Sequence, residues 1–143
     1  MKGENAVKRT LSRLRSINGL VTASLVEPDS AHVLETVVAG NDADDSRTSG
    51  DSTATTVAAA ASDIVQVIGL MAAGLGEPDQ LEDVIVTLGR QHHLITSLPT
   101  AGSDGLLVVV TLDRARTNLA IARQQLRAVG PLLENLTAVD RVS

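Results

Sequence analysis

The sequence predicts an α+β fold, a five-stranded antiparallel sheet with helices on both faces. Three segments within residues 81–112 are rich in Val, Ile, Leu and Thr, at 81–88, 93–98 and 106–112. This composition is typical of β-strands. The links between the segments are too short to hold a crossover helix, so neighbouring strands should run antiparallel. Residues 106–110 are apolar without a break, which indicates a central strand covered on both faces.

The first part of the chain supplies a helix and two further strands. Val7, Leu11 and Leu14 recur at helical spacing within residues 4–16, which predicts an amphipathic helix. Residues 20–27 and 31–39 have the composition of strands. The turn between them contains Pro28 and Asp29, residue types that favour a tight turn. We therefore expect a β-hairpin here.

A polar segment and a long helix follow the hairpin. Residues 40–51 are acidic and aperiodic, which predicts a mobile loop; they lack the ligand spacing of a calcium-binding EF-hand. Residues 52–73 contain no proline and predict one helix that ends at Gly74 and Gly76. This helix has apolar residues on two sides. We expect one side to contact the sheet and the other to contact a second subunit.

The chain closes with a second long helix over residues 117–133. Leu119, Ala122, Leu126 and Leu133 belong to a narrow apolar seam that should face the sheet. Pro131 should end or kink this helix because proline cannot donate a backbone hydrogen bond. The predicted order is α-β-β-α-β-β-β-α, in a single domain over residues 1–136 with a C-terminal tail over 137–143.

The composition narrows the possible functions. The 143 residues include no Phe, Tyr, Trp or Cys, and the net charge is −5. The lack of aromatic residues and the negative charge disfavour nucleic-acid binding. Disulfides and thiolate chemistry are excluded. We expect no membrane insertion and a cytoplasmic protein, because no apolar run reaches the length of a membrane span.

No motif predicts a catalytic, cofactor or metal site. The glycine spacing of residues 69–74 resembles a phosphate loop, but the Lys and Ser/Thr of that motif are missing. His92 and His93 are neighbours on a strand and should point to opposite faces, as solvent-exposed strand-end histidines. An exposed arginine could still act on the nucleotide of a partner. Arg47 in the polar segment and Arg90 in a tight turn are the candidates.

Two local strings resemble the Roadblock family, the dynein-light-chain-related regulators of Ras-like GTPases. The string Leu14-Arg-Ser-Ile-Asn-Gly19-Leu-Val resembles the passage from the first helix of the family into its first strand. Residues 106–112, followed by Asn118-Leu-Ala-Ile-Ala-Arg123, resemble its last strand and final helix. The resemblance covers roughly residues 11–133 and is strongest to the prokaryotic, especially actinobacterial, branch. The segment 40–51 and the turn at Pro28 depart from the family pattern.

The resemblance implies a homodimer in which the middle helix and the third strand pair with their copies. It also implies a non-enzymatic regulator or scaffold for a small Ras-like GTPase, linked in some systems to a sensor kinase. The interface residues expected on this basis are Val57, Ala58, Ala61, Ile64, Val65, Ile68, Val84 and Val86.

The alternative function is that of a ligand-sensing or general dimerisation module, because helix-flanked sheets of the profilin or PAS kind often enclose small molecules. Such a module needs a pocket with a few convergent polar groups. The sheet-facing positions look wholly aliphatic, which argues against it.

Overall fold

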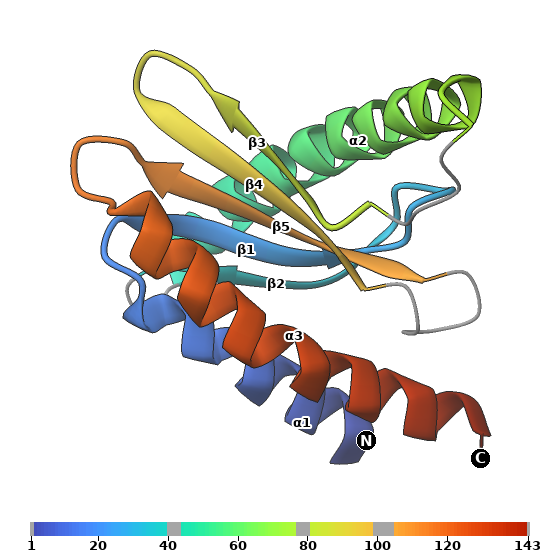
Figure 1. Ribbon diagram of the computed structural model, residues 1–143. Helices are drawn as coiled ribbons and strands as arrows, with labels where there is room; N and C mark the ends of the chain where they lie inside the picture. Colours follow the sequence, from blue (N-terminus) through green and yellow to red (C-terminus); the bar gives the residue numbers. More distant parts are fainter. Residues whose placement is uncertain (1, 40–43, 77–80, 99–104, 143) are drawn as a thin grey trace.

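The chain forms three layers, with the sheet between α2 on one face and α1 and α3 on the other (Figure 1). The computed structural model describes residues 2–39, 44–76, 81–98 and 105–142, with side chains for 6–39, 54–76, 81–98 and 105–137. The elements are α1 (Lys2–Ser12), the 3-10 turn η1 (Arg13–Ser16), β1 (Leu20–Val26), β2 (Val33–Val38), α2 (Asp44–Gly74), β3 (Asp83–Thr87), β4 (Gln91–Leu98), β5 (Leu106–Asp113) and α3 (Leu119–Val142).

The sheet is antiparallel throughout, and its five strands follow the order β2-β1-β5-β4-β3. The central strand is β5, whose residues 106–112 are all buried. This confirms the predicted fold class and the predicted position of the apolar segment. The two edges of the sheet are therefore formed by β2 and β3.

The larger core lies between the sheet and the pair α1 and α3, which pack side by side (Figure 1). It is aliphatic, as the composition requires, and Leu11, Leu14, Leu112 and Leu133 are fully buried within it. The predicted seam of α3 is part of this core. A chain without aromatic residues gains its core energy from many such small contacts.

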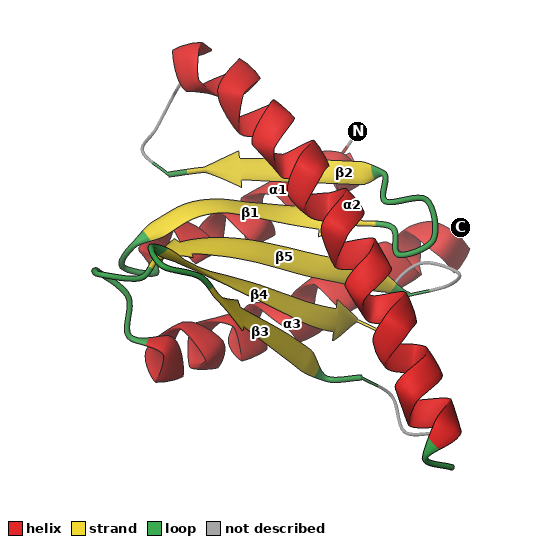
Figure 2. Cartoon of the chain, turned by 90° about the horizontal axis from the view of Figure 1, so that it is seen from above, coloured by secondary structure: helices red, strands yellow, loops and turns green. Residues whose placement is uncertain are grey.

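The smaller core lies under the N-terminal half of the described part of α2. Ala58 and Ala61 pack there on Ile95, Leu107 and other residues of the sheet. The helix crosses the sheet obliquely, over the β2 edge first, and its C-terminal end projects beyond the β3 edge (Figure 2). Only part of its apolar surface is consequently covered by its own chain.

The α2 side of the sheet carries a buried polar layer, so the expectation of wholly aliphatic sheet-facing positions is wrong. Thr22, Ser24 and Thr111 are buried there. Ser24 Oγ lies 3.2 Å from the hydroxyl oxygen of Thr36. Buried hydroxyls are tolerated when they are hydrogen-bonded. The alternation of side chains along the strands did not predict this polar layer, because Thr is itself a common strand residue.

The helix α2 begins earlier than the sequence predicts. It starts at Asp44, so the prediction of a loop is wrong for residues 44–51, while residues 40–43 lie outside the described part of the chain. The acidic residues Asp44 and Asp45 fall in the first turn of the helix. Negative charge near a helix N-terminus is stabilising, which favours a helix start at this position.

The helix α3 continues through Pro131 to Val142, so of the two predicted effects of this proline, an end or a kink, the end is wrong. The predicted tail, residues 137–143, is therefore helical up to residue 142. An interior proline costs a helix about 3 kcal/mol. The residues on either side of it compensate, because Val129 and Leu133 are both buried against the sheet.

Candidate functional site

The C-terminal half of α2 exposes a row of large apolar side chains. Val67, Leu70, Met71 and Leu75 are all exposed, and Leu70 reaches 75% of its full accessibility. They are exposed because the C-terminal end of the helix extends beyond the sheet (Figure 2). Isolated exposed apolar residues are ordinary, but a contiguous row on one element indicates an interaction surface.

The same helix is also as long and apolar as a membrane span, as core helices of folded domains often are. Residues Ala54–Gly74 are long and apolar enough to cross a membrane by length and composition, with a mean hydropathy of 1.6. Only 17% of the most apolar 18-residue window within it is buried inside the chain. Its N-terminal part nevertheless packs on the sheet through Ala54, Ala58 and Ala61. The uncovered apolar surface is thus confined to one part of a helix that belongs to the fold.

Beside this row, β3 presents an open backbone edge. The amide of Leu88 donates to the carbonyl of Gln91 at 2.8 Å, and the amide of Ser97 donates to Glu82 at 3.0 Å. Even-numbered residues of β3 therefore face β4 with their backbone groups, because these groups alternate along a strand. The backbone N–H and C=O groups of Asp83, Ile85 and Thr87 point away from the sheet.

The opposite edge, β2, is better protected. The amide of Ala39 donates to Val21 at 3.0 Å, so the backbone groups of Val38 point outward. Arg15 Nε donates to this outward carbonyl at 3.1 Å. Both α1 and α2 also contact β2. A charged side chain laid over an edge discourages further strand pairing, so β3 is the edge available to another chain.

The predicted interface residues fall into two groups. Ala58 and Ala61 are each 1% exposed and pack on the sheet of their own chain. Val57, Ile64, Val65, Ile68, Val84 and Val86 are half-buried. Leu70, Leu75 and Ile85 are exposed as well, and the predicted set does not include them. Helical spacing could have found the first two, which continue the stripe that begins at Val67.

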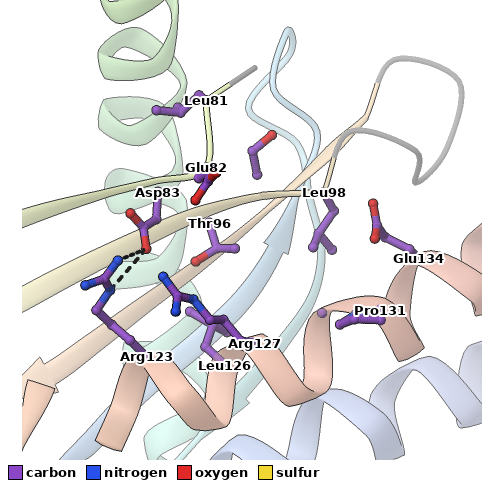
Figure 3. Close-up of a pocket in the computed structure, with 12 residues that line it drawn as sticks. Leu81, Glu82, Asp83, Thr96, Leu98, Arg123, Leu126, Arg127, Pro131 and Glu134 are labelled. Carbon is purple, nitrogen blue, oxygen red and sulfur yellow. Dashed lines mark hydrogen bonds and ion pairs between the residues drawn. The ribbon is translucent and has the colours of Figure 1, made fainter. Parts of the chain in front are cut away.

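A pocket of about 480 Å³ lies on the other face of the sheet, between α3 and the strands β3 and β4 (Figure 3). Its apolar lining includes Leu98, Leu126 and Pro131. At its rim, Arg123 Nε and Nη2 donate to Asp83 Oδ2 at 3.2 and 3.0 Å. This ion pair ties α3 to the edge strand.

The histidines differ from the predicted solvent-exposed pair, although they do point to opposite faces. His92 is only 8% exposed, and its Nδ1 lies 3.0 Å from Thr87 Oγ1. His93 is half-buried on the α2 side, with Nδ1 3.0 Å from Thr111 Oγ1. Burial, and secondarily the charge of His92, lower the pKa of His93 below 6.5. In the described part of the chain, no cluster of three His, Asp or Glu residues is placed to hold a metal ion.

The two candidate arginines occupy different settings. Arg47 lies within α2 rather than in a loop, and its side chain is outside the described set. Arg90 is exposed in the turn between β3 and β4, and its carbonyl accepts from the amide of Arg114 at 3.0 Å.

A five-stranded antiparallel sheet, with one long helix on one face and two helices on the other, defines a Roadblock-like α+β fold. No family model matches the sequence, and no curated protein matches it. Solved structures do match. MglB, a gliding protein from Thermus thermophilus, aligns with a TM-score of 0.75 at 15% identity, over 96% of this chain and 92% of the other.

Two further structures agree. MglB in a tetrameric arrangement aligns with a TM-score of 0.76 at 14% identity, over 96% of this chain and 91% of that one. A Roadblock/LC7 domain from Streptomyces avermitilis aligns with a TM-score of 0.70 at 16% identity, over 90% of this chain and 94% of the domain. The resemblance seen in the sequence is thereby confirmed at the level of the fold.

Proposed function

We propose that this chain is a non-enzymatic homodimeric regulator or scaffold that binds a small Ras-like GTPase in a signalling system. The observation that carries the proposal is the row of exposed apolar residues on α2 beside the unpaired edge of β3. Each feature alone is a liability in solution, since apolar rows and open strand edges promote aggregation. A second copy of the chain covers both at once.

The physical case for a second copy rests on self-complementarity. A twofold axis brings the same patch of each subunit together, so an apolar row meets an apolar row and a strand edge meets a strand edge. Burying a Leu or Met side chain contributes about 1.5–3 kcal/mol. The row contains Val67, Leu70, Met71 and Leu75, so its burial in both subunits gives a substantial driving force even after the cost of association.

The GTPase as partner rests on the Roadblock-like fold and on the sequence resemblance. Arg90 supports it as the exposed arginine of the β3–β4 turn, close to the proposed dimer surface. An arginine that enters a nucleotide site stabilises the charge that develops on the phosphates during hydrolysis. A scaffold that only binds the GTPase needs no such group, so hydrolysis and binding are separate readouts.

The test mixes the chain with the Ras-like GTPase encoded nearest to its gene, loaded with GDP or with a GTP analogue. We expect co-elution in one nucleotide state. A faster hydrolysis that is lost in Arg90→Ala, with binding retained, identifies an activator; binding without faster hydrolysis identifies a scaffold. Absence of binding in both nucleotide states removes the GTPase from the proposal.

A second candidate function, ligand sensing, is favoured by the pocket of about 480 Å³ beside α3. This volume is within the range of small-molecule sites. The arginines Arg123 and Arg127 and the carboxylates Asp83 and Glu134 all line it. A thermal-shift screen with metabolites tests this function. A ligand that raises the melting temperature of the wild type but not of Thr96→Trp, which places a large ring in the pocket from a half-buried strand position, would establish it.

A further inference from the structure

We infer that the helical layer formed by α1, η1 and α3 docks with its outer face on an anionic phospholipid surface. This layer lies on the opposite face of the sheet from α2 (Figure 1), so the inference depends neither on the proposed dimer nor on a GTPase partner. The contact is peripheral, because both helices keep their inner sides in the core of the chain.

The charge of the helical layer is opposite in sign to that of the whole chain. The chain has a net charge of −5, yet the described side chains of α1, η1 and α3 include six basic residues and only one acidic residue, Glu134. Four of the six are exposed, and within the described part of the chain their side chains have no hydrogen bond or ion pair: Lys8, Arg9, Arg13 and Arg127. The other two basic residues bind groups of their own chain. Four cations of this layer are therefore available to a partner.

An exposed apolar strip separates these cations. It consists of Ile121 and Leu132 on α3, which are 53% and 38% exposed and share one side of the helix because they are about three turns apart. Gln125 lies on the same side, and its Nε2 donates to Ser16 Oγ of η1 at 3.0 Å. This side of α3 therefore borders α1 and η1, whereas Arg127 lines the pocket on the β3 side.

A phospholipid surface satisfies both parts of this arrangement. Anionic headgroups attract basic side chains, and each Lys or Arg near such a surface strengthens binding about fivefold. Apolar side chains next to the cations can enter the boundary between headgroups and acyl chains. An acidic protein segment would neutralise the cations but would leave Ile121 and Leu132 without an apolar partner. The combination favours a lipid surface.

The distribution of charge also gives the docked chain an orientation. On the other face of the sheet, α2 contains four acidic residues and one basic residue. An anionic surface therefore attracts one face of the chain and repels the other. Docking through the helical layer leaves the apolar row of α2 directed toward solution, where a protein partner can reach it.

Co-sedimentation of the full chain with lipid vesicles tests the inference. The probes are vesicles of phosphatidylcholine alone and vesicles of phosphatidylcholine mixed with phosphatidylglycerol. We expect the chain to bind the mixed vesicles at least about tenfold more tightly than the neutral ones. Added salt should weaken this binding, because the screening length falls from about 10 Å at 0.1 M to about 3 Å at 1 M.

Two variants with the same net charge separate the helical layer from the charge of the whole chain. Arg9→Gln combined with Arg13→Gln removes two cations from the layer, and we expect at least about tenfold weaker binding to the mixed vesicles. Arg90→Glu changes the net charge by the same amount, but Arg90 is exposed in the β3–β4 turn, outside the layer. We expect it to weaken binding by less than about threefold. Far-UV circular dichroism confirms that each variant is folded.

Four results would overturn the inference. Equal binding to both kinds of vesicle removes the electrostatic contact, and absence of binding to either kind removes the lipid surface altogether. An equal loss in Arg90→Glu and in the double variant means that net charge decides and that the helical layer is not the docking face. Binding to soluble polyglutamate without binding to vesicles assigns the cations to an acidic protein. The assay contains no GTPase and no nucleotide, so its failure leaves the proposed function in place.

Discussion

At the scale of single residues, Gly19 has the tightest conformational requirement. Its φ is +88°, and a Cβ placed there would lie 2.2 Å from the hydroxyl oxygen of Thr117 and 3.0 Å from the carbonyl oxygen of Asp113. That hydroxyl donates to the carbonyls of Asn18 and Asp113 at 2.9 and 2.8 Å. Gly19 thus lets the start of β1 approach the end of β5, where the amide of Asp113 donates to the carbonyl of Gly19 at 2.7 Å.

We expect Gly19→Ala to lower the free energy of unfolding by at least about 1–2 kcal/mol, the cost of a left-handed conformation for a residue with a Cβ. Urea denaturation measures it. Gly69→Ala is the matched control. Nothing lies within 4 Å of a Cβ at this helical position, so the substitution should stabilise by up to about 1 kcal/mol. Equal effects of both substitutions would contradict the role assigned to Gly19.

The lowered pKa of His93 implies that the stability of the folded chain depends on pH. Burial lowers the pKa of His93 in the folded chain below 6.5, so the unfolded chain binds the proton more readily. The stabilisation is complete above pH 6.5 and is lost as the pH falls from 6.5 toward the lowered pKa. Denaturation at several pH values should show this loss in the wild type and a flatter profile in His93→Gln. Parallel profiles would mean that His93 is not the group responsible.

At the scale of elements, α2 has two functions along its length: the N-terminal part packs on the sheet and the C-terminal part exposes apolar residues. Sequence periodicity predicted two apolar sides but not which residues occupy them. Ala58 was assigned to an interface and is instead buried in the core. Periodicity shows which face of a helix is apolar. How much of that face contacts the sheet depends on the angle at which the helix crosses it, and this angle is not encoded in the local sequence pattern.

We expect Leu70→Glu to weaken self-association at least tenfold, because a charge at the proposed interface must be desolvated in both subunits. Sedimentation velocity over a dilution series measures the dissociation constant. Ile121→Glu on α3 is the matched control, since Ile121 is also exposed, at 53%, but lies on the opposite face of the sheet. A loss of association in the control alone would place the interface on α3.

Pro131 gives a prediction for α3. Proline usually ends or kinks a helix, but α3 continues through Pro131. Val129 and Leu133, on either side of the proline, are both buried and hold this part of the helix against the core. Pro131→Ala restores the backbone donor, so we expect the free energy of unfolding to rise by about 1–3 kcal/mol. Thermal unfolding followed by circular dichroism measures it. A lower melting temperature would show that the ring of Pro131, which lines the pocket, stabilises more by packing than it costs in the helix.

At the scale of the whole molecule, element order, the pairing of strands joined by short links and the central place of β5 could be predicted from local composition, whereas the pairing of β1 with β5 could not. The strands at 106–112 and 20–27 differ from the structure by one residue at most. The candidate site was predicted less well. Exposure of Leu70, the open backbone of Ile85 and the ion pair of Arg123 with Asp83 depend on how elements distant in sequence are arranged, and no local pattern contains that arrangement.

The account depends most on a second copy of the chain covering α2 and the β3 edge. Sedimentation equilibrium of the wild-type protein tests this most directly. We expect a molecular mass twice the 14.8 kDa of one chain, falling toward that of one chain in Leu70→Glu. A wild-type mass of a single chain at every accessible concentration would contradict the account.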